Sequence, residues 1–187
     1  MGDRQNQDVT SAKEPPAMSF ELVVIPVSDV ERAKRFYAAL GWSCDIDHKV
    51  DGALRIVQFT PPGSRGSIMF GKNISRAAPG TVQGLHLIVR DIEAARLDLL
   101  GRGIAVSEAF HDEGGIFHRV GPDGLSPGRN PKNKSYASYA SFSDPDGNGW
   151  VLQEVTARLS ADLSSDDERF TPELVQAALS HMREQAA

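Results

Sequence analysis

The stretch Val27-Ser28-Asp29-Val30-Glu31-Arg32-Ala33 recurs 62 positions later as Val89-Arg90-Asp91-Ile92-Glu93-Ala94-Ala95. Each copy follows an apolar run typical of a β-strand and precedes a helical pattern, which ends at Leu40-Gly41 in one copy and at Leu100-Gly101 in the other. Self-similarity at a fixed spacing is the signature of a repeated structural unit. The chain is therefore expected to contain two copies of one strand–helix module.

Capping residues predict where the helices begin. In the first copy, Ser28 is expected to cap the helix, and Glu31 is expected to reach back and complete a capping box. In the second copy, Asp91 is expected to be the cap. Gly41 suits the left-handed position that follows a last helical turn, and Gly101 and Gly103 are expected to end the second helix.

Short β-like runs follow each helix, separated by turn-forming residues. The predicted strands are Trp42 to His48, Ala53 to Thr60 and Ser67 to Gly71 in the first half, and Ile104 to Glu108, Tyr136 to Phe142 and Gly149 to Thr156 in the second. With the strand before each helix, the order is β-α-β-β-β, twice.

The pattern divides the chain into a flexible polar leader, two modules and a C-terminal extension. We expect the leader at 1–17, the modules at 18–80 and 81–156, and a linker with a helix at 157–187. The segment 109–135 contains little periodicity, which is typical of a lid or a mobile excursion.

The C-terminal helix has its own start signal and its own apolar face. Thr171 is expected to cap it and Pro172 to occupy its first turn. The apolar stripe consists of Leu174, Val175, Ala178, Leu179 and Met182. Such a helix packs on its own domain or on a partner subunit.

Composition excludes several classes of protein. Twenty Lys and Arg against 25 Asp and Glu give a formal charge of −5, which disfavours a nucleic-acid partner. A single cysteine, Cys44, cannot close an intrachain disulfide, so we expect a cytoplasmic protein. No apolar run approaches the roughly 20 residues that cross a bilayer, so no membrane partner is expected.

Together with the doubled β-α-β-β-β order, three motifs resemble the vicinal oxygen chelate superfamily: Val23 to Asp29, Arg35-Phe36-Tyr37 with Leu40-Gly41, and Ser143 to Gly149. This superfamily includes glyoxalase I, extradiol dioxygenases, fosfomycin-resistance transferases and bleomycin-resistance proteins. The resemblance covers about residues 20–156. It implies an α+β fold in which two paired modules form a curved eight-stranded sheet, with a concave cleft and with the helices on the outer face.

The resemblance also implies four positions for a divalent metal, one in the first strand and one in the last strand of each module. They fall on Leu22, Gly84, Met69 and Val151. Glyoxalase-type metals need imidazole or carboxylate ligands, and none of these residues supplies one. We therefore expect no metal at the usual site, and no other cofactor.

Strand alternation predicts which side chains line the cleft. The expected lining residues are Leu22, Val24, Met69, His86, Val151 and Gln153, and Phe117 with Ile116 is expected to fold over the cleft mouth as a lid. His86 is the candidate catalytic residue, or contacts a ligand, or is simply hydrogen-bonded into the sheet. With a shifted strand register, Glu154 would be its companion at an unconventional metal site.

Other candidate sites carry less weight. His111-Asp112-Glu113 and His118 have metal-ligand residue types, but a glycine-rich loop favours a solvated segment. The basic residues Arg129, Lys132 and Lys134 form either an anion-binding patch or a solvated face. Cys44 alternates with apolar neighbours, which predicts core packing.

Three functions fit these observations. The first is binding of a hydrophobic or amphipathic small molecule in the cleft without a metal, as in the bleomycin-resistance type. The second is a lyase, isomerase or dioxygenase with unconventional metal ligands or with metal-free assistance from His86. The third is a non-catalytic interaction module. A homodimer is expected, because oligomers of this kind are common and the C-terminal stripe offers a contact.

Overall fold

The computed structural model describes residues 16–112, 124–160 and 162–185. The first module contains β1 (Leu22–Val24), α1 (Val30–Ala39), β2 (Ser43–Val50), β3 (Leu54–Thr60) and β4 (Ser67–Lys72). The second contains β5 (Leu85–Val89), α2 (Ile92–Gly101), β6 (Phe110–Asp112), β7 (Leu125–Pro127), β8 (Ser138–Ser143) and β9 (Gly149–Glu154). Helix α3 (Pro172–Gln185) follows them.

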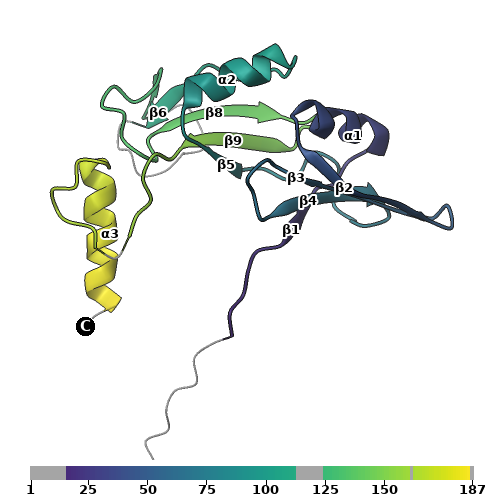
Figure 1. Ribbon diagram of the computed structural model, residues 1–187, viewed down its shortest axis with the longest axis horizontal. Helices are drawn as coiled ribbons and strands as arrows, with labels where there is room; N and C mark the ends of the chain where they lie inside the picture. The colour runs from purple at the N-terminus through teal and green to yellow at the C-terminus, as the bar shows by residue number, and fades with distance from the viewer. Residues whose placement is uncertain (1–15, 113–123, 161, 186–187) are drawn as a thin grey trace, which may run out of the picture.

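Each module folds into a mixed sheet of the same topology, which confirms the repeat and the α+β class. The strand orders are β1-β4-β3-β2 and β5-β9-β8-β6-β7, and in each sheet the first strand lies parallel to the last strand of its module. Helices α1 and α2 lie on the same side of the two sheets (Figure 1). Hydrogen bonding within the described part of the chain thus gives sheets of four and five strands, in place of one eight-stranded sheet.

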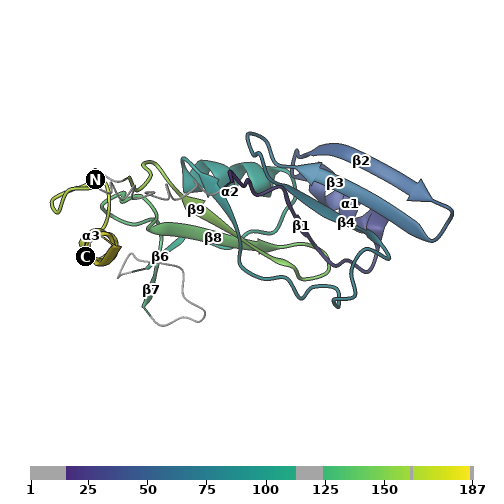
Figure 2. The ribbon, with the colours of Figure 1, turned by 90° about the horizontal axis from the view of Figure 1, so that it is seen from below.

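The two sheets lie side by side in one elongated layer (Figure 2), and each leaves one edge strand toward the other module. Strands β1 and β5 occupy these edges, and each is hydrogen-bonded on one side only among the described strands. The free backbone groups of an edge strand are available to another segment or to a ligand. The edge of β5 becomes important for the site.

The helix caps differ in part from the expectation. Asp29, and not Ser28, caps α1, and its carboxylate accepts a hydrogen bond from the Arg32 amide at 3.0 Å. The Ser28 hydroxyl instead contacts Asp146 of the second module, and Glu31 pairs with Arg55 at 2.6 Å. Ser28 and Glu31, the two residues of the expected capping box, therefore form tertiary contacts instead of capping the helix. The expected caps Asp91 of α2 and Thr171 of α3 are confirmed.

The second module departs from the prediction at its outer edge. Only one bridge, between Val106 and Phe142, forms in the predicted strand 104–108, because the Ser107 carbonyl accepts from Arg96 at 2.7 Å. The Ser107 hydroxyl takes the place of that carbonyl and accepts from the Ser141 amide at 2.9 Å. Strands β6 and β7 form instead within 109–135, so this segment is partly structured.

One hydrophobic core joins the modules, and aromatic rings fill it. Tyr37 of α1 lies with its ring centroid 6.2 Å from that of Trp150 in β9, and Trp42 lies 5.2 Å from Trp150. Tyr37 is completely buried, and Trp42 and Trp150 nearly so. Because a single core spans both halves, neither module is expected to fold without the other.

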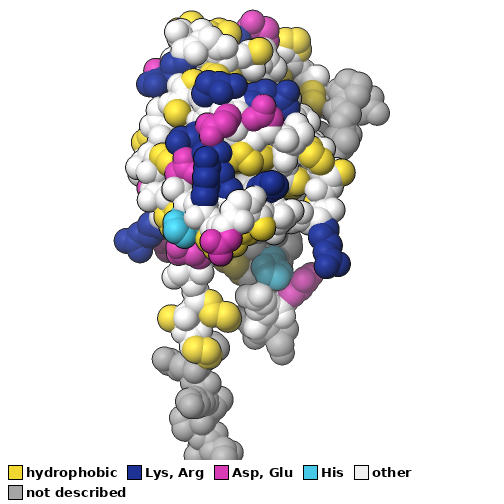
Figure 3. All heavy atoms as spheres, turned by 90° about the vertical axis from the view of Figure 1, so that its right-hand side faces the viewer, with side chains coloured by type: hydrophobic (Ala, Val, Ile, Leu, Met, Phe, Trp, Pro, Cys, Tyr) yellow, Lys and Arg dark blue, Asp and Glu magenta, His cyan; other side chains and the backbone are white. Residues whose placement is uncertain are grey.

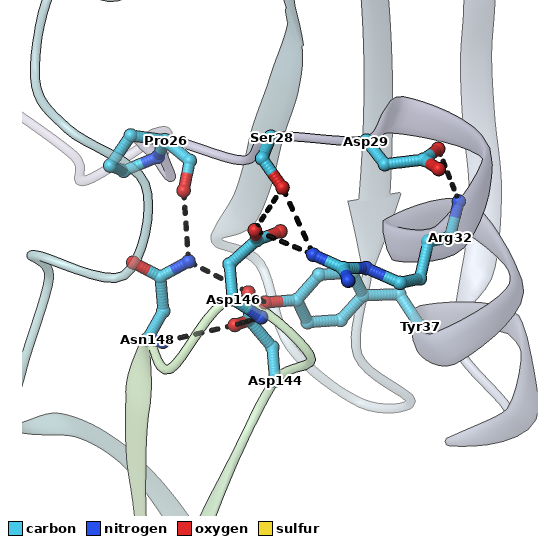
Figure 4. A network of polar contacts seen from close by, with 8 residues as sticks. All are labelled: Pro26, Ser28, Asp29, Arg32, Tyr37, Asp144, Asp146 and Asn148. Atoms are coloured by element: carbon cyan, nitrogen blue, oxygen red, sulfur yellow. Dashed lines mark hydrogen bonds and ion pairs between the residues drawn. The ribbon is translucent and has the colours of Figure 1, made fainter.

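A buried polar network also joins the modules (Figure 4). The turn between β8 and β9 presents Asp144, whose carboxylate accepts from the Tyr37 hydroxyl at 3.0 Å and from Asn148 Nδ2 at 2.7 Å. Asn148 Nδ2 also donates to the Pro26 carbonyl at 3.0 Å. At the rim of this network, Arg32 pairs with Asp146 at 2.7 Å. All of these residues except Arg32 belong to the motifs that carry the family resemblance, and here they hold the two modules together.

Ion pairs cover the end of the molecule formed by α1 and β2. Arg55 Nε donates to Asp47 at 2.8 Å, and Lys34 donates to the same carboxylate at 2.6 Å. These two bonds hold the pKa of Asp47 well below its usual range. Figure 3 shows Lys and Arg side chains interspersed with Asp and Glu over this end. This face carries a mixture of charges and no continuous basic surface.

Helix α3 stands apart from the other two helices (Figure 1) and has a small core of its own. Leu174 and Val175 are buried against Leu163 and Phe170, and the Phe170 ring lies 6.2 Å from Tyr136. The helix is therefore anchored to the linker and to the segment before β8. No helix in the described residues is long and apolar enough to span a membrane.

Candidate functional site

His86 lies on the face of β5 opposite the helices, where it contacts Gln153 of β9. Leu85, Leu87 and Val89 pack on the helix side, so the predicted alternation of β5 is confirmed. His86 Nδ1 lies 3.3 Å from Gln153 Oε1. The site thus has a histidine oriented by an amide, where acid–base catalysis of the usual kind uses a carboxylate.

The tautomer of His86 follows from the contacts of Gln153. Gln153 Nε2 donates to the Tyr136 carbonyl at 3.1 Å and to the Tyr139 hydroxyl at 3.3 Å, so the amide oxygen faces His86. That oxygen is an acceptor only, and Nδ1 must therefore carry the proton. In the neutral imidazole, Nε2 is then a hydrogen-bond acceptor.

Tyr139 completes this polar chain, and alternation in β8 could have identified it. It pairs in register with Gln153, and its hydroxyl donates to the Tyr136 carbonyl at 2.6 Å. Burial raises the pKa of the Tyr139 hydroxyl to about 12, so this hydroxyl stays protonated as a donor near neutral pH. The chain from His86 through Gln153 to Tyr139 is fixed at every step by hydrogen bonds.

The remaining predicted lining residues fall on two sheets. Val151 pairs in register with His86 and shares its face. Val24 pairs with Met69 on the first sheet, and Leu22 lies on the same strand face as Val24. The two pockets that His86 lines do not include Leu22, Val24 or Met69. Phe117 and Ile116, the predicted lid, lie outside the described residues.

A groove follows the free edge of β5, and sequence reasoning missed it. It has two sections of about 550 and 530 Å³, both lined by His86 and Leu87 of β5 and by the loop between β3 and β4. Loop residues shared by the two sections include Pro61 and Arg65. A concave, largely apolar site of this volume suits a small organic molecule. Nothing in strand periodicity could have shown it, because a loop that is distant in sequence forms its other wall.

The four implied metal positions do not fit a metal ion. Leu22, Met69 and Val151 offer carbon or a thioether, and Gly84 has a φ of 71°, a left-handed conformation that favours glycine over a ligand-bearing residue. Within the described residues, no three His, Cys, Asp or Glu side chains gather so that they could hold an ion. The donor chemistry of the four positions is what excludes the usual site.

The proposed companion of His86 is on the other side of the sheet. Glu154 is 1% exposed and accepts two hydrogen bonds from Arg129, at 2.8 and 2.7 Å. Glu154 alternates with Gln153, so a carboxylate at 154 cannot face His86 in this register. The shifted register on which a Glu154–His86 pair depended is therefore not the register of this sheet.

The weaker sequence candidates also have structural roles. His111 Nδ1 lies 2.9 Å from the Gly128 carbonyl, and Lys134 donates to the Glu168 carbonyl. Of the three basic residues considered as a patch, Arg129 is paired with Glu154, and Lys134 is held by the Glu168 carbonyl. Glu113 and His118 lie outside the described residues. Cys44 is exposed, and not in the core, because it lies on β2, an edge strand in which every residue is exposed.

Comparison with known families identifies the fold. The profile of the Glyoxalase/Bleomycin resistance protein/Dioxygenase superfamily matches residues 19–152. The chain belongs to this superfamily. The match spans both modules and ends within β9, so α3 lies beyond it. No curated protein matches the chain.

Solved structures of this superfamily share the fold along nearly their full length. TnmS3, described as an antibiotic binding protein from Streptomyces sp. CB03234, is 29% identical, with a TM-score of 0.56 over 76% of this chain and 99% of that chain. A glyoxalase/bleomycin resistance protein from the same organism is 32% identical, with a TM-score of 0.52 over 73% and 100%. A superfamily member from Sphaerobacter thermophilus DSM 20745 is 30% identical, with a TM-score of 0.53 over 74% and 98%.

Proposed function

We propose that this protein binds a hydrophobic or amphipathic small molecule beside His86 and that it does so without a divalent metal. The observation that carries the proposal is the replacement of all four implied metal ligands by Leu22, Gly84, Met69 and Val151. An apolar wall with one oriented histidine is suited to binding, because it offers buried apolar contact and a single directional hydrogen bond. The similarity to a protein described as antibiotic binding supports the same conclusion.

The orientation of His86 indicates which polar group the ligand carries. Since Nδ1 donates to Gln153, the second ring nitrogen is left as an acceptor for a ligand hydroxyl. His86 lines both sections of the groove. A ligand with an aromatic or aliphatic body and one O–H group is complementary to this arrangement.

A matched pair of compounds tests this proposal. We expect 4-phenylphenol to bind more tightly than biphenyl in calorimetric titration, since only the phenol donates a hydrogen bond to His86. The His86→Ala variant should bind the phenol roughly two- to tenfold more weakly, the range for one neutral hydrogen bond. Its affinity for biphenyl should change little.

His181→Ala is the control, because His181 is an exposed residue of α3 and does not line the groove. It should bind both compounds as the unchanged protein does. If neither compound binds or raises the melting temperature, the proposed function is wrong.

Elemental analysis of protein purified without chelators tests whether the protein holds a metal ion. A stoichiometric transition metal that is lost in His86→Ala would favour the enzyme hypothesis in its place.

We also infer a homodimer in which the two sets of lining residues meet between copies. The first sheet presents an uncovered row in register, Ile46–Gln58–Met69–Val24, and Ile46 is 43% exposed. On the second sheet, His86 is exposed on the face opposite the helices, whereas its neighbours Val151 and Gln153 are buried. A second copy would bring the two faces together and cover apolar surface that a monomer leaves in water.

Light scattering coupled to size exclusion measures this dimer. The unchanged protein is expected to elute with twice the chain mass, and Met69→Lys to elute as a monomer, because a charge would be buried in the contact. Leu97→Lys is the control: Leu97 is also apolar and is 66% exposed, but it lies on α2 on the helix side. A monomeric unchanged protein, or a dimeric Met69→Lys variant, would contradict this arrangement.

A further inference from the structure

The groove beside β5 exists because the two modules are packed differently at equivalent places. In the first module, Tyr37 of α1 fills the space under the turn between β8 and β9 and donates to Asp144. The 62-residue repeat places Leu99 of α2 at the position of Tyr37, and Asp98 at that of Phe36. These smaller side chains face the loop between β3 and β4, and the space between them forms the groove section of about 550 Å³.

The loops that face the two helices also differ in charge. The turn against α1 supplies two carboxylates, and Asp146 neutralises Arg32 at 2.7 Å. The loop against α2, Pro61 to Gly66, contains no acidic residue and contributes Arg65 to the groove. The position that holds carboxylates in one module therefore holds a guanidinium in the other.

Two arginines line the 550 Å³ section, and neither has an ion pair or hydrogen bond within the described residues. They are Arg65 and Arg158, and both side chains are exposed. The only acidic residue lining either section is Asp98, and its carboxylate already accepts from Arg102 at 2.7 Å. In a chain of net charge −5, the groove is thus locally positive. Exposed guanidinium groups beside an apolar wall are suited to a carboxylate or sulfonate.

We propose that this groove binds an amphipathic anion, whose apolar body lies against Leu87 and Leu99 and whose acidic group is held by Arg65 and Arg158. The inference rests on the proposed function and names the ligand class for the groove that His86 lines. Charge complementarity favours an organic acid over a neutral or cationic compound.

Two fluorescent probes with the same ring system separate charge from apolar contact. The two probes are 8-anilinonaphthalene-1-sulfonate and its uncharged counterpart, N-phenyl-1-naphthylamine. The sulfonate is expected to bind about tenfold more tightly, which corresponds to about 1.4 kcal/mol from charge-assisted hydrogen bonds. Added salt should reduce this preference, because both arginines are exposed to solvent.

The variants Arg65→Ala and Arg158→Ala should each weaken sulfonate binding several-fold and leave the uncharged probe unaffected. Arg35→Ala is the matched control, because Arg35 is also exposed but lies on α1 and does not line the groove. Leu99→Phe should fill the groove as Tyr37 fills its counterpart, and should weaken the binding of both probes; thermal melting checks that this variant of a core residue is folded at the temperature of the titration.

Each result decides between the two proposals. Equal binding of the two probes, unaffected by either arginine variant, would overturn the anion proposal and leave small-molecule binding intact. If neither probe binds to the protein, the result would count against the proposed function itself. If Leu99→Phe folds and binds both probes as the unchanged protein does, the ligand does not lie in this groove. The anion proposal would then be wrong about the binding site.

Discussion

Replacing Asn148 with Ala is expected to lower the free energy of unfolding by about 3 kcal/mol, since several buried polar groups lose their partners at once. Asn148 is completely buried. Its amide donates to the Pro26 carbonyl and to Asp144, and its oxygen accepts from the Val82 amide at 3.2 Å. Alanine would leave all three groups without this partner, in a place where water cannot readily replace it.

The effect should be measured by urea unfolding and by thermal melting. For a chain of this size, a loss of about 3 kcal/mol corresponds to a decrease of about 6–12 °C in the melting temperature. Ser28→Ala is the control, because Ser28 contacts Asp146 at the exposed rim of the same network. It should cost less than about 0.5 kcal/mol, as surface substitutions do.

An intermediate variant tests how far the network extends. Tyr37→Phe keeps the buried ring and removes only the hydroxyl that donates to Asp144. Burial, together with the negative charge of Asp144, raises the pKa of Tyr37 well above its usual range, so the hydroxyl is a stable donor. We expect a loss of about 1–2 kcal/mol. If Asn148→Ala were as stable as the unchanged protein, this network would not hold the modules together.

Replacing Arg129 with Met is expected to destabilise the protein by about 3 kcal/mol, because it leaves a carboxylate buried without its counter-charge. Glu154 is 1% exposed, and both of its oxygens accept from Arg129. The same contact raises the pKa of the Arg129 guanidinium. Breaking such a pair from one side costs more than the pair itself contributes.

A second substitution distinguishes the buried charge from lost packing. In the Arg129→Met background, Glu154→Gln replaces the carboxylate by a neutral amide of similar shape and should recover part of the stability. Arg102→Met is the control, because it breaks the exposed pair with Asp98 and should cost less than about 1 kcal/mol. The interpretation is wrong if Arg129→Met behaves like Arg102→Met, or if Glu154→Gln makes the double variant less stable still.

Predictions from local chemistry were correct for some parts of the fold. They were wrong where other residues compete for the same hydrogen-bonding groups. Asp91 caps α2 as expected, and its carboxylate accepts from the Glu93 and Ala94 amides of the first helical turn. Ser28 does not cap α1, because its hydroxyl donates a hydrogen bond to Asp146, in a turn more than a hundred residues away. The predicted strand 104–108 failed for a related reason, since Arg96 takes the carbonyl of Ser107 that a ladder would need.

The candidate site shows the same division. Alternation placed His86 and Gln153 on one face, and the structure adds the hydrogen bond that orients the imidazole. Only a shifted register would have made Glu154 a companion of His86, and in the structure Arg129, a residue of the region without periodicity, binds Glu154 on the opposite face. Arg65 and Arg158 gave no periodic signal, because both lie outside regular strands and helices.

The sequence by itself determined the two modules, the strand order of the first module and the lack of metal-binding side chains at four positions, because repeats, alternation and side-chain chemistry are local properties. Only the tertiary structure decided that the motifs of the resemblance tie the modules together and that a groove opens along β5. Both features depend on residues that are far apart in sequence: Tyr37 meets Asp144 in one module, and the smaller Leu99 faces a loop without carboxylates in the other. What fills a space, and what leaves it open, is set by packing across the fold.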